Sequence, residues 1–313
     1  MGLIQSAKSG IFLLVLVYLS FPNLCYGARK LTELYQAPAM VLTYHNGALL
    51  AGNTRVSILW YGKFTAAQKS IVADFFLSLS QQNQAVLSST TPTVSQWWGM
   101  IQTYIEKAGK KDTQLIISYQ TTDEGYSMGK SLTRSQISEL AANSNSKADG
   151  IALVLTADDV TVEGFCMSFC GFHDSNSVKK STFIWVGNSV TQCPGQCAWP
   201  FHQPIYGPQS PPLGAPNGDV GMDGMIVNIA SLLAGTVTNP FRNGFYEGQA
   251  GAQLEAASAC TGIYGKDAYP GYAGELLVDS STGASYNAQG ANGRKYLLPA
   301  LYNPRTSSCW TTV

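Results

Sequence analysis

Seven cysteines are the residues of this 313-residue chain best suited to covalent or metal chemistry. Cys25 stands alone near the N-terminus, and the other six lie in the second half: Cys166, Cys170, Cys193, Cys197, Cys260 and Cys309. An even set of six is typical of three disulfides in an oxidising compartment, and fifteen pairings remain open. The two C-x3-C pairs also admit a zinc site, although structural zinc pairs are usually closer and mostly intracellular. We expect these cysteines to hold loops together and not to catalyse.

A serine hydrolase pattern, G-x-S-x-G, occurs at Gly125–Gly129 with Ser127 at its centre. In hydrolases that use this pattern, a strand ends at the serine and a helix begins directly after it. Here the preceding predicted strand ends near Tyr119, and the next predicted helix begins only at Thr133. We therefore interpret the segment as a glycine-rich turn, with a serine hydrolase as the alternative.

Metal-binding patterns are weak in this sequence. No H-E-x-x-H motif is present, and the three histidines lie far apart, with His173 expected as a packed or hydrogen-bonded loop residue. Asn217, Asp219 and Asp223 offer spaced oxygen atoms, but the length and final Glu of a calcium loop are absent. We expect no metal ion and no other cofactor.

Aromatic side chains suggest a third kind of chemistry, the stacking of sugar rings. Trp97 and Trp98 are the most conspicuous pair, and the chain also holds 16 Tyr. The two tryptophans lie on a predicted helix among apolar residues at core spacing. Packing in the core is therefore the preferred interpretation for this pair, because large aromatic side chains dominate buried area.

The N-terminal residues have the three parts of a secretory signal peptide. A short segment with Lys8 precedes the apolar run Ile11–Leu19. The breaker Pro22 and the small residues Cys25 and Gly27 then indicate a cleavage site before Ala28. The apolar run has about half the ~20 residues that span a bilayer, and an uncleaved anchor is the alternative. We expect residues 1–27 to be removed, residues 28–313 to form a single secreted domain, and no membrane span to remain.

Charge and composition argue against some classes of binding partner. Lys plus Arg equals Asp plus Glu, at 19 each, and loss of Lys8 leaves a net charge of about −1. No basic cluster suggests binding to nucleic acid or to an anionic membrane. The chain is 45% hydrophobic, too apolar for disorder, and its 31 Gly indicate long ordered loops.

Periodicity predicts the elements that position these residues. Buried strands are expected at residues 54–61, 115–119, 151–156 and 182–186, with shorter strands at 275–279 and 295–302. Helices are expected at residues 65–80, 94–108, 133–142 and 223–238, with a loop over 193–220. Strands that alternate with helices predict an α/β fold: a mixed sheet with flanking helices and a loop-rich, disulfide-stapled C-terminal part.

Several sequence segments are similar to those of a known family. They are FCMSFCGFHD, WVGN, QCPGQCAWPFHQPIYGPQ, PNGDVGMDGM, TNPF, LEAASAC, AYPGYAGELLVD and NGRKYLLPAL. In these segments the chain resembles the plant EXORDIUM group of the phosphate-induced protein 1 family, and the resemblance covers essentially the whole chain after residue 27 and is closest over residues 165–304. The resemblance implies an extracellular protein of the apoplast and cell wall that promotes cell expansion and growth in a hormone-responsive manner, the brassinosteroid response included. It implies no known catalytic reaction.

Other branches of this wider family carry H-E-L-A-E on the late helix, with a further Asp just before a Cys, in the manner of a zinc-protease site. In this chain Ser231 stands at the His position, Leu232 at the general-base Glu, and Gly235 at the second carboxylate. Ser258, two residues before Cys260, stands at the Asp. A hydroxyl is a poor zinc ligand, and leucine cannot accept a proton. The resemblance implies a zincin-like core without its metal ligands, and an ordinary core helix is the alternative.

These observations predict a secreted, non-enzymatic growth regulator that binds an extracellular partner, either a wall component or a receptor, through its loop-rich C-terminal half. The absence of a complete catalytic set in the sequence favours this function. Two alternatives remain open: an extracellular hydrolase, either an atypical metallopeptidase or a serine hydrolase, and a module that binds wall carbohydrate.

Overall fold

A five-stranded sheet organises the structure, a computed structural model that describes residues 40–80, 91–144, 150–167, 169–176 and 181–313. Met40–Val313 form one unit of contacts. The expected signal peptide over residues 1–27, with Cys25 and the cleavage point before Ala28, lies outside the described residues.

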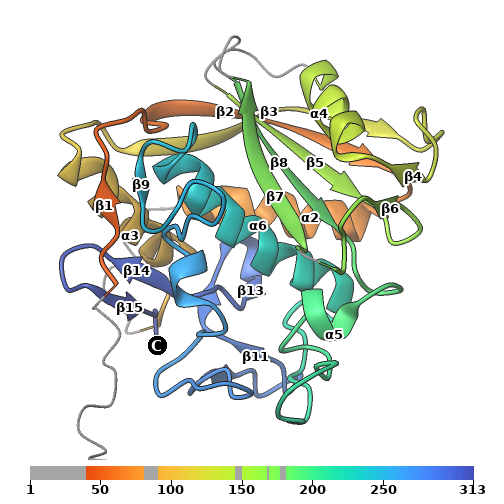
Figure 1. The fold of residues 1–313 in the computed structure, drawn as a ribbon. Coiled ribbons are helices and arrows are strands. Elements are labelled where there is room, and N and C mark those ends of the chain that lie inside the picture. Colours follow the sequence, from red (N-terminus) through yellow and green to blue (C-terminus); the bar gives the residue numbers. More distant parts are fainter. Residues whose placement is uncertain (1–39, 81–90, 145–149, 168, 177–180) are drawn as a thin grey trace, which may run out of the picture. The chain divides into compact units, whose positions relative to one another are not determined.

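The sheet is mixed, as the sequence predicts. Its strand order is β3 (Thr113–Asp123), β2 (Gly52–Tyr61), β5 (Ile151–Thr156), β8 (Ser181–Gly187) and β7 (Gly171–Asn176) (Figure 1). The first four strands are parallel, and β7 pairs antiparallel to β8 at the edge. The four parallel strands were predicted from their apolar runs, whereas the edge strand β7 was not.

Three of the longer helices begin with the same chemistry. They are α2 (Ala66–Leu79), α3 (Val94–Lys107) and α4 (Arg134–Asn143). The threonine before each helix accepts a hydrogen bond from the backbone of a Gln three residues later, and the Gln side chain accepts one from the threonine backbone. Such reciprocal capping satisfies two otherwise unpaired N–H groups and fixes the start of the helix.

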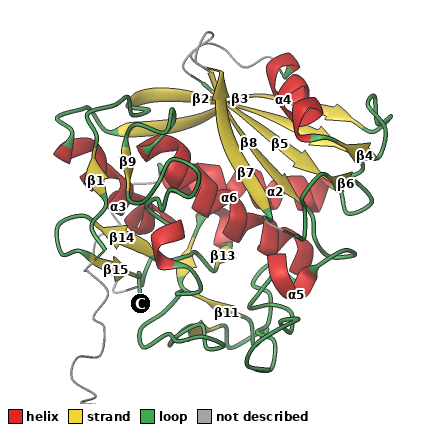
Figure 2. Cartoon of the chain, in the orientation of Figure 1, coloured by secondary structure: helices red, strands yellow, loops and turns green. Residues whose placement is uncertain are grey.

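Both faces of the sheet are buried, but by different helices (Figure 2). On β2, Ile58 and Trp60 belong to the large core with α2, α3 and α6 (Val220–Thr238), whereas Leu59 belongs to a second core with α4. This alternation follows from the two-residue period of a strand. Trp97 and Trp98 are only 1% and 3% exposed, so the prediction that they pack in the core is confirmed.

Helix α6 crosses the large core. Asp219 caps its start through a hydrogen bond from the Met222 N–H, and the helix ends at Asn239, directly before Pro240. By length and composition, α6 is the one described helix that could cross a membrane, but it is mostly buried inside the protein. Its apolar character is that of a core helix.

The C-terminal part consists of loops joined by short elements. The predicted loop over 193–220 holds one turn of helix, α5 (Pro194–Cys197). The predicted strands at 275–279 and 295–302 are shorter than expected, because the backbone pairs over only two or three residues at a time. The remaining short elements are β1 (Thr43–Tyr44), β4 (Ser131–Leu132), β6 (Thr161–Val162), β9 (Phe245–Tyr246), η1 (Ser258–Cys260), β10 (Leu277–Val278), β11 (Ser285–Tyr286), β12 (Ala288–Gln289), η2 (Ala291–Gly293), β13 (Lys295–Tyr296), β14 (Leu301–Asn303) and β15 (Ser308–Trp310).

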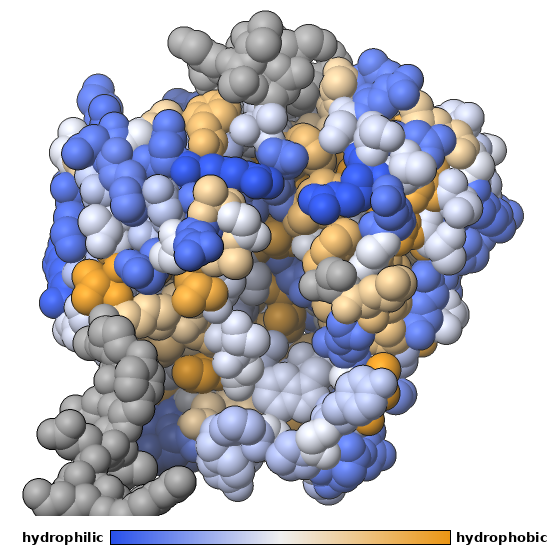
Figure 3. All heavy atoms as spheres, viewed as in Figure 1, coloured by the Kyte–Doolittle hydropathy of each residue, from blue (hydrophilic) through white to orange (hydrophobic). Residues whose placement is uncertain are grey.

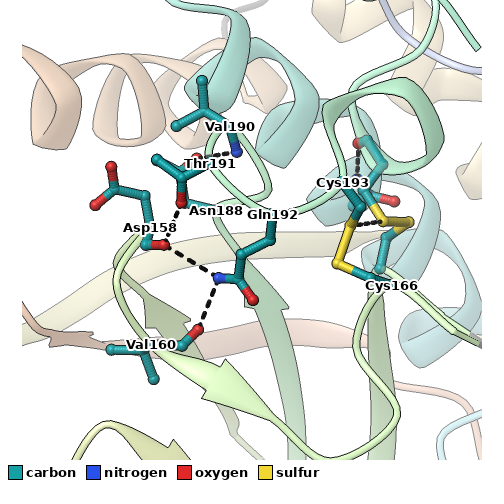
Figure 4. Close-up of a disulfide and its surroundings, with 11 residues drawn as sticks. Asp158, Val160, Cys166, Asn188, Val190, Thr191, Gln192 and Cys193 are labelled. Atoms are coloured by element: carbon teal, nitrogen blue, oxygen red, sulfur yellow. Dashed lines mark hydrogen bonds between the residues drawn. A yellow bond between two sulfur atoms is a disulfide. The ribbon is translucent and has the colours of Figure 1, made fainter.

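All six described cysteines are paired, so three disulfides are confirmed and the zinc alternative is wrong. The pairs are Cys166–Cys193, Cys170–Cys197 and Cys260–Cys309. The first two join the loop before β7 to α5. Figure 4 shows the first of them with Gln192 beside it, whose side-chain amide donates to the carbonyls of Asp158 and Val160.

Candidate functional site

The face of α6 where the resemblance implies lost metal ligands lies against the edge strand β7. An ideal Cβ placed on Gly171 of β7 would lie 2.8 Å from a methyl carbon of Leu232, so this leucine packs closely on the strand. Ser231 is half-buried beside it. Ser258 lies in η1, and its hydroxyl accepts a hydrogen bond of 2.8 Å from the Glu255 N–H.

The space above Gly235 is occupied by a carboxylate. An ideal Cβ on Gly235 would lie 2.2 Å from Glu255 Oε2 and 3.3 Å from His173 Nε2. His173 Nε2 lies 2.8 Å from the same Glu255 oxygen, and Asn239 Nδ2 donates to Glu255 Oε1 at 2.7 Å. We call His173, Gly235, Asn239 and Glu255 the α6 cluster. Its carboxylate takes the place that a side chain at position 235 would need.

The α6 cluster is poorly arranged for catalysis. The side chains of His173 and Glu255 are 11% and 14% exposed. The Nε2 of His173 is engaged by the carboxylate, and its Nδ1 is buried without a hydrogen-bond partner among the described residues. Neither nitrogen is therefore free to exchange a proton with a substrate in solvent. Within the described ranges, no three His, Cys, Asp or Glu side chains come together as a metal site.

Sequence reasoning did not identify His173 and Glu255 as a pair. The prediction that His173 is hydrogen-bonded is confirmed, but it lies in strand β7 and not in a loop. Its partner is 82 residues further along the chain, and no local pattern links the two positions. Figure 3 shows this face of the molecule hollowed near its centre, in the part of the view where α6 lies in Figure 1.

The predicted glycine-rich turn around Ser127 is confirmed. Strand β3 ends at Asp123, and the Ser127 hydroxyl donates to that carboxylate at 2.5 Å. The Ser127 N–H points to the same side chain. Each of the three histidines has its contacts elsewhere, so no described imidazole could act as a base for this serine.

Asn217, Asp219 and Asp223, which offer spaced oxygen atoms in the sequence, stabilise the start of α6. Asp219 caps the helix, and Asp223 accepts hydrogen bonds from the N–H and the side-chain amide of Asn217, at 2.8 and 2.6 Å. Burial raises the pKa of Asp223 to about 7, because the charged form loses its hydration and the two hydrogen bonds only partly compensate. These groups hold the loop before α6 in place.

A second candidate site is a cavity of about 590 Å³ among the C-terminal loops, which we call the loop pocket. Its lining is dominated by aromatic, proline and glycine residues and comes from two segments, 195–208 and 261–271. Trp199, Tyr206 and Tyr269 are its aromatic residues. Tyr206 and Tyr269 are 87% and 64% exposed, so two large rings are open to solvent at this site.

One wall of the loop pocket is a tight turn. Tyr269 and Tyr272 exchange two backbone hydrogen bonds, of 3.1 and 2.8 Å, across Pro270 and Gly271. Gly271 has a φ of +90°, which is typical of a type II turn with Pro before Gly. The turn places the two tyrosine rings 5.1 Å apart.

The opposite wall packs on this turn. A Cβ on Gly271 would lie 2.5 Å from Pro208, and the Ser210 hydroxyl donates to the Gly271 carbonyl at 2.6 Å. The Gln209 side chain donates to the carbonyls of Pro204 and Gly207, which closes the loop on itself. Disulfide cysteines lie next to both walls, since Cys197 is two residues before Trp199 and Cys260 directly precedes Thr261.

The loop pocket is electrically neutral. None of its described lining residues is charged. The nearest charges in the sequence, Lys266 and Asp267, lie 4.0 Å apart and are both mostly exposed. The polar side-chain groups of the lining, besides the tyrosine hydroxyls and the indole N–H of Trp199, are those of Gln196 and Thr261.

The comparisons with known proteins agree with the resemblance. The family model of the phosphate-induced protein 1 conserved region matches residues 42–312. The chain belongs to this family. It is 56% identical to Protein PHOSPHATE-INDUCED 1 of Nicotiana tabacum, over 98% of this chain and 100% of that protein. It is also 55% identical to Protein EXORDIUM-like 1 of Arabidopsis thaliana, over 86% and 89%.

A third relative, Protein EXORDIUM of Arabidopsis thaliana, is 52% identical over 95% of this chain and 97% of that protein. No solved structure matches the chain. Both candidate sites lie within the matched region, so membership of the family does not by itself choose between them.

Proposed function

We propose that this member of the phosphate-induced protein 1 family is a secreted, cell-wall-associated protein that promotes cell expansion in a hormone-responsive manner by binding a partner, without catalysing a reaction. The proposal combines what the family resemblance implies with the arrangement of the two candidate sites. The loop-rich C-terminal half supplies the binding surface.

One observation carries the non-catalytic part of this proposal: the carboxylate of Glu255 fills the place of a side chain at position 235. A Cβ there would lie 2.2 Å from Glu255 Oε2, so an acidic ligand projecting from Gly235 has no room. Leu232 packs on β7 where a general base would be needed. We propose that the scaffold is zincin-like, with α6 beneath the edge strand, and that internal hydrogen bonds now replace the metal.

The disulfides support the extracellular part. Every described cysteine is bonded, and two of the three bridges each join cysteines that are 27 residues apart in sequence. Such bridges form and persist in oxidising compartments. The signal peptide expected over residues 1–27 would direct the chain to such a compartment and would remove Cys25, the one remaining cysteine.

The test is made on the protein secreted by plant cells and purified from residue 28 onward. We expect its zinc content, measured by mass spectrometry, to be far below one atom per chain, and we expect no cleavage of a peptide library. We also expect the protein to be recovered in the wall fraction and its overproduction to lengthen growing organs. Stoichiometric zinc would contradict the loss of the metal site, and peptide cleavage that a Ser231→Ala variant abolishes would show that the protein is a hydrolase.

The serine hydrolase alternative has its own measurement. Because the Ser127 hydroxyl donates to the Asp123 carboxylate, which is a much weaker base than the imidazole of a serine hydrolase, a fluorophosphonate probe is expected to leave this serine unlabelled. Stoichiometric labelling that is lost in Ser127→Ala, with Ser135→Ala as the control for a second exposed hydroxyl, would contradict the proposal.

A further inference from the structure

We infer that the loop pocket is a binding site for a neutral glycan chain of the β-linked glucose type. The inference rests on the proposed function, because it names the wall component that a non-catalytic wall protein of this family would bind. Four properties of the loop pocket support it: the exposed rings, the absence of charged lining residues, the free polar groups and the rigidity of the loops.

Flat aromatic rings are exposed at the loop pocket. Tyr206 is 87% exposed and Tyr269 is 64% exposed, although folding normally buries such large rings. In a β-linked glucose chain the hydroxyls are equatorial and the axial C–H bonds lie on the two ring faces. Each sugar therefore presents an apolar face that stacks on an aromatic ring, while its hydroxyls remain at the edge. Two exposed rings and the half-buried Trp199 offer such surfaces within one cavity.

The lining of the loop pocket offers no charge to a ligand. No lining side chain carries a charge, and Lys266, the nearest cation in sequence, lies 4.0 Å from Asp267. An acidic polysaccharide would have to lose hydration from its carboxylates without gaining a cation in return, which is unfavourable. A neutral sugar has no such cost. The pocket therefore discriminates against pectin-like chains.

Several polar groups of the loop pocket are available to a ligand. Within the described residues, the hydroxyls of Tyr206 and Tyr269 and the side-chain amide of Gln196 make no hydrogen bond to the protein. The Thr261 hydroxyl donates to the Ser258 carbonyl and can still accept. These groups offer the donors and acceptors that the equatorial hydroxyls of a sugar need.

The loops around the pocket are held in place by internal bonds. The Tyr269–Tyr272 turn is closed by two backbone hydrogen bonds, and Ser210 ties it to the opposite wall. Disulfides anchor both walls next to the pocket, through Cys197 and Cys260. A site that is already ordered loses less conformational entropy when it binds, which matters for a ligand that gains little from each contact.

Proline-rich peptides are the main competing ligand, since they also dock on aromatic-lined grooves. The glycan is favoured because the walls contain Gly207 and Gly262, where an added Cβ would meet no atom closer than 3.9 Å and a flat ring can approach the backbone. It is also favoured because the tyrosine hydroxyls and the Gln196 amide are free to bind hydroxyls. The prolines of the lining belong to the protein itself, where they stiffen the loops.

The experiment uses the protein from residue 28 onward and cellohexaose as the probe, with binding measured by isothermal titration calorimetry. We expect the double variant Tyr206→Ala/Tyr269→Ala to weaken binding by about ten-fold or more for each ring removed, as stacking on exposed rings predicts. The variant Tyr269→Phe keeps the ring and should bind nearly as well as the unmodified protein. Tyr119→Ala removes a ring that is 47% exposed on β3, far from the pocket in sequence, and serves as the matched control.

Retention on isolated wall material separates this inference from the proposed function. Retention that the double variant loses and the control keeps supports both. Retention that the double variant keeps overturns the glycan site but leaves the binding function intact, whereas no retention of the unmodified protein overturns the binding function itself. Stronger binding to polygalacturonate or to a proline-rich peptide than to cellohexaose also overturns the inference.

Discussion

The α6 cluster and the loop pocket differ in where their polar and aromatic groups are directed. In the α6 cluster, Glu255 receives hydrogen bonds from both His173 and Asn239, and the methyl-sized space above Gly235 is filled. In the loop pocket, Tyr206 and Tyr269 face solvent and their hydroxyls have no partner within the described chain. The first region uses its chemistry to hold the fold, and the second leaves its chemistry available. The exposed rings on rigid loops are therefore the first place to test for binding, before the residue set that is typical of catalysis.

The largest expected effect concerns the start of α6, where the folded protein raises the pKa of Asp223 to about 7. Between about pH 4 and pH 7, the folded chain therefore keeps a proton on Asp223 that the unfolded chain, with a carboxyl pKa of 3.8, has already released. Stability should therefore fall as the pH rises through this window, by roughly 4 kcal/mol at most. Urea unfolding at several pH values measures the slope, and Asp223→Asn should remove it. An unchanged slope in Asp223→Asn would assign the titration to other groups.

Removal of one bridge next to the loop pocket should have a slightly smaller effect. The double variant Cys170→Ala/Cys197→Ala opens a loop of 27 residues and should cost about 3 kcal/mol in unfolding free energy. It should also weaken ligand binding, because the wall over residues 195–208 loses its anchor at Cys197. The variant Cys166→Ala/Cys193→Ala opens a loop of the same length and is the matched control for stability. Binding that survives in full would show that the pocket does not depend on this anchor.

The smallest expected effect tests whether the Glu255 carboxylate fills the space above Gly235. Gly235→Ala places a methyl group against the Glu255 carboxylate and should cost about 2 kcal/mol, since the hydrogen bonds from His173 and Asn239 are disturbed. In the Glu255→Ala background the same change should be neutral, or stabilising by up to about 1 kcal/mol, as expected of Gly→Ala in a helix. A double-mutant cycle measures the difference. Equal effects in the two backgrounds would mean that the carboxylate does not fill this space.

Much of the framework could be predicted from the sequence, because local patterns decide it. The apolar runs at 54–61 and 151–156 and the helix start at Thr133 are each read within a few residues. Strand β7 was missed, since its sequence GFHDSN is mostly polar and its pairing with β8 is a tertiary effect. A polar strand at a sheet edge gives no periodic signal.

The candidate sites were harder to predict for the same reason. The resemblance pointed to Gly235 and Ser258. It did not point to the pair of His173 and Glu255 that lies against Gly235, because these two residues come from distant parts of the chain. The loop pocket depends on backbone turns and on a disulfide pairing that the sequence left open. Sequence reasoning named Trp97, Trp98 and the tyrosines as a possible sugar-stacking surface and correctly preferred core packing for the two tryptophans, but it did not single out the exposed tyrosines of the C-terminal loops.

One measurement tests the division between the two regions most directly: recovery in the cell-wall fraction of two variants produced side by side. Gly235→Ala disturbs the α6 cluster, and Tyr206→Ala/Tyr269→Ala removes the exposed rings of the loop pocket. We expect the first variant to be retained on the wall like the unmodified protein and the second to be released. Retention of the ring variant together with release of Gly235→Ala would place the function at α6 and contradict this account.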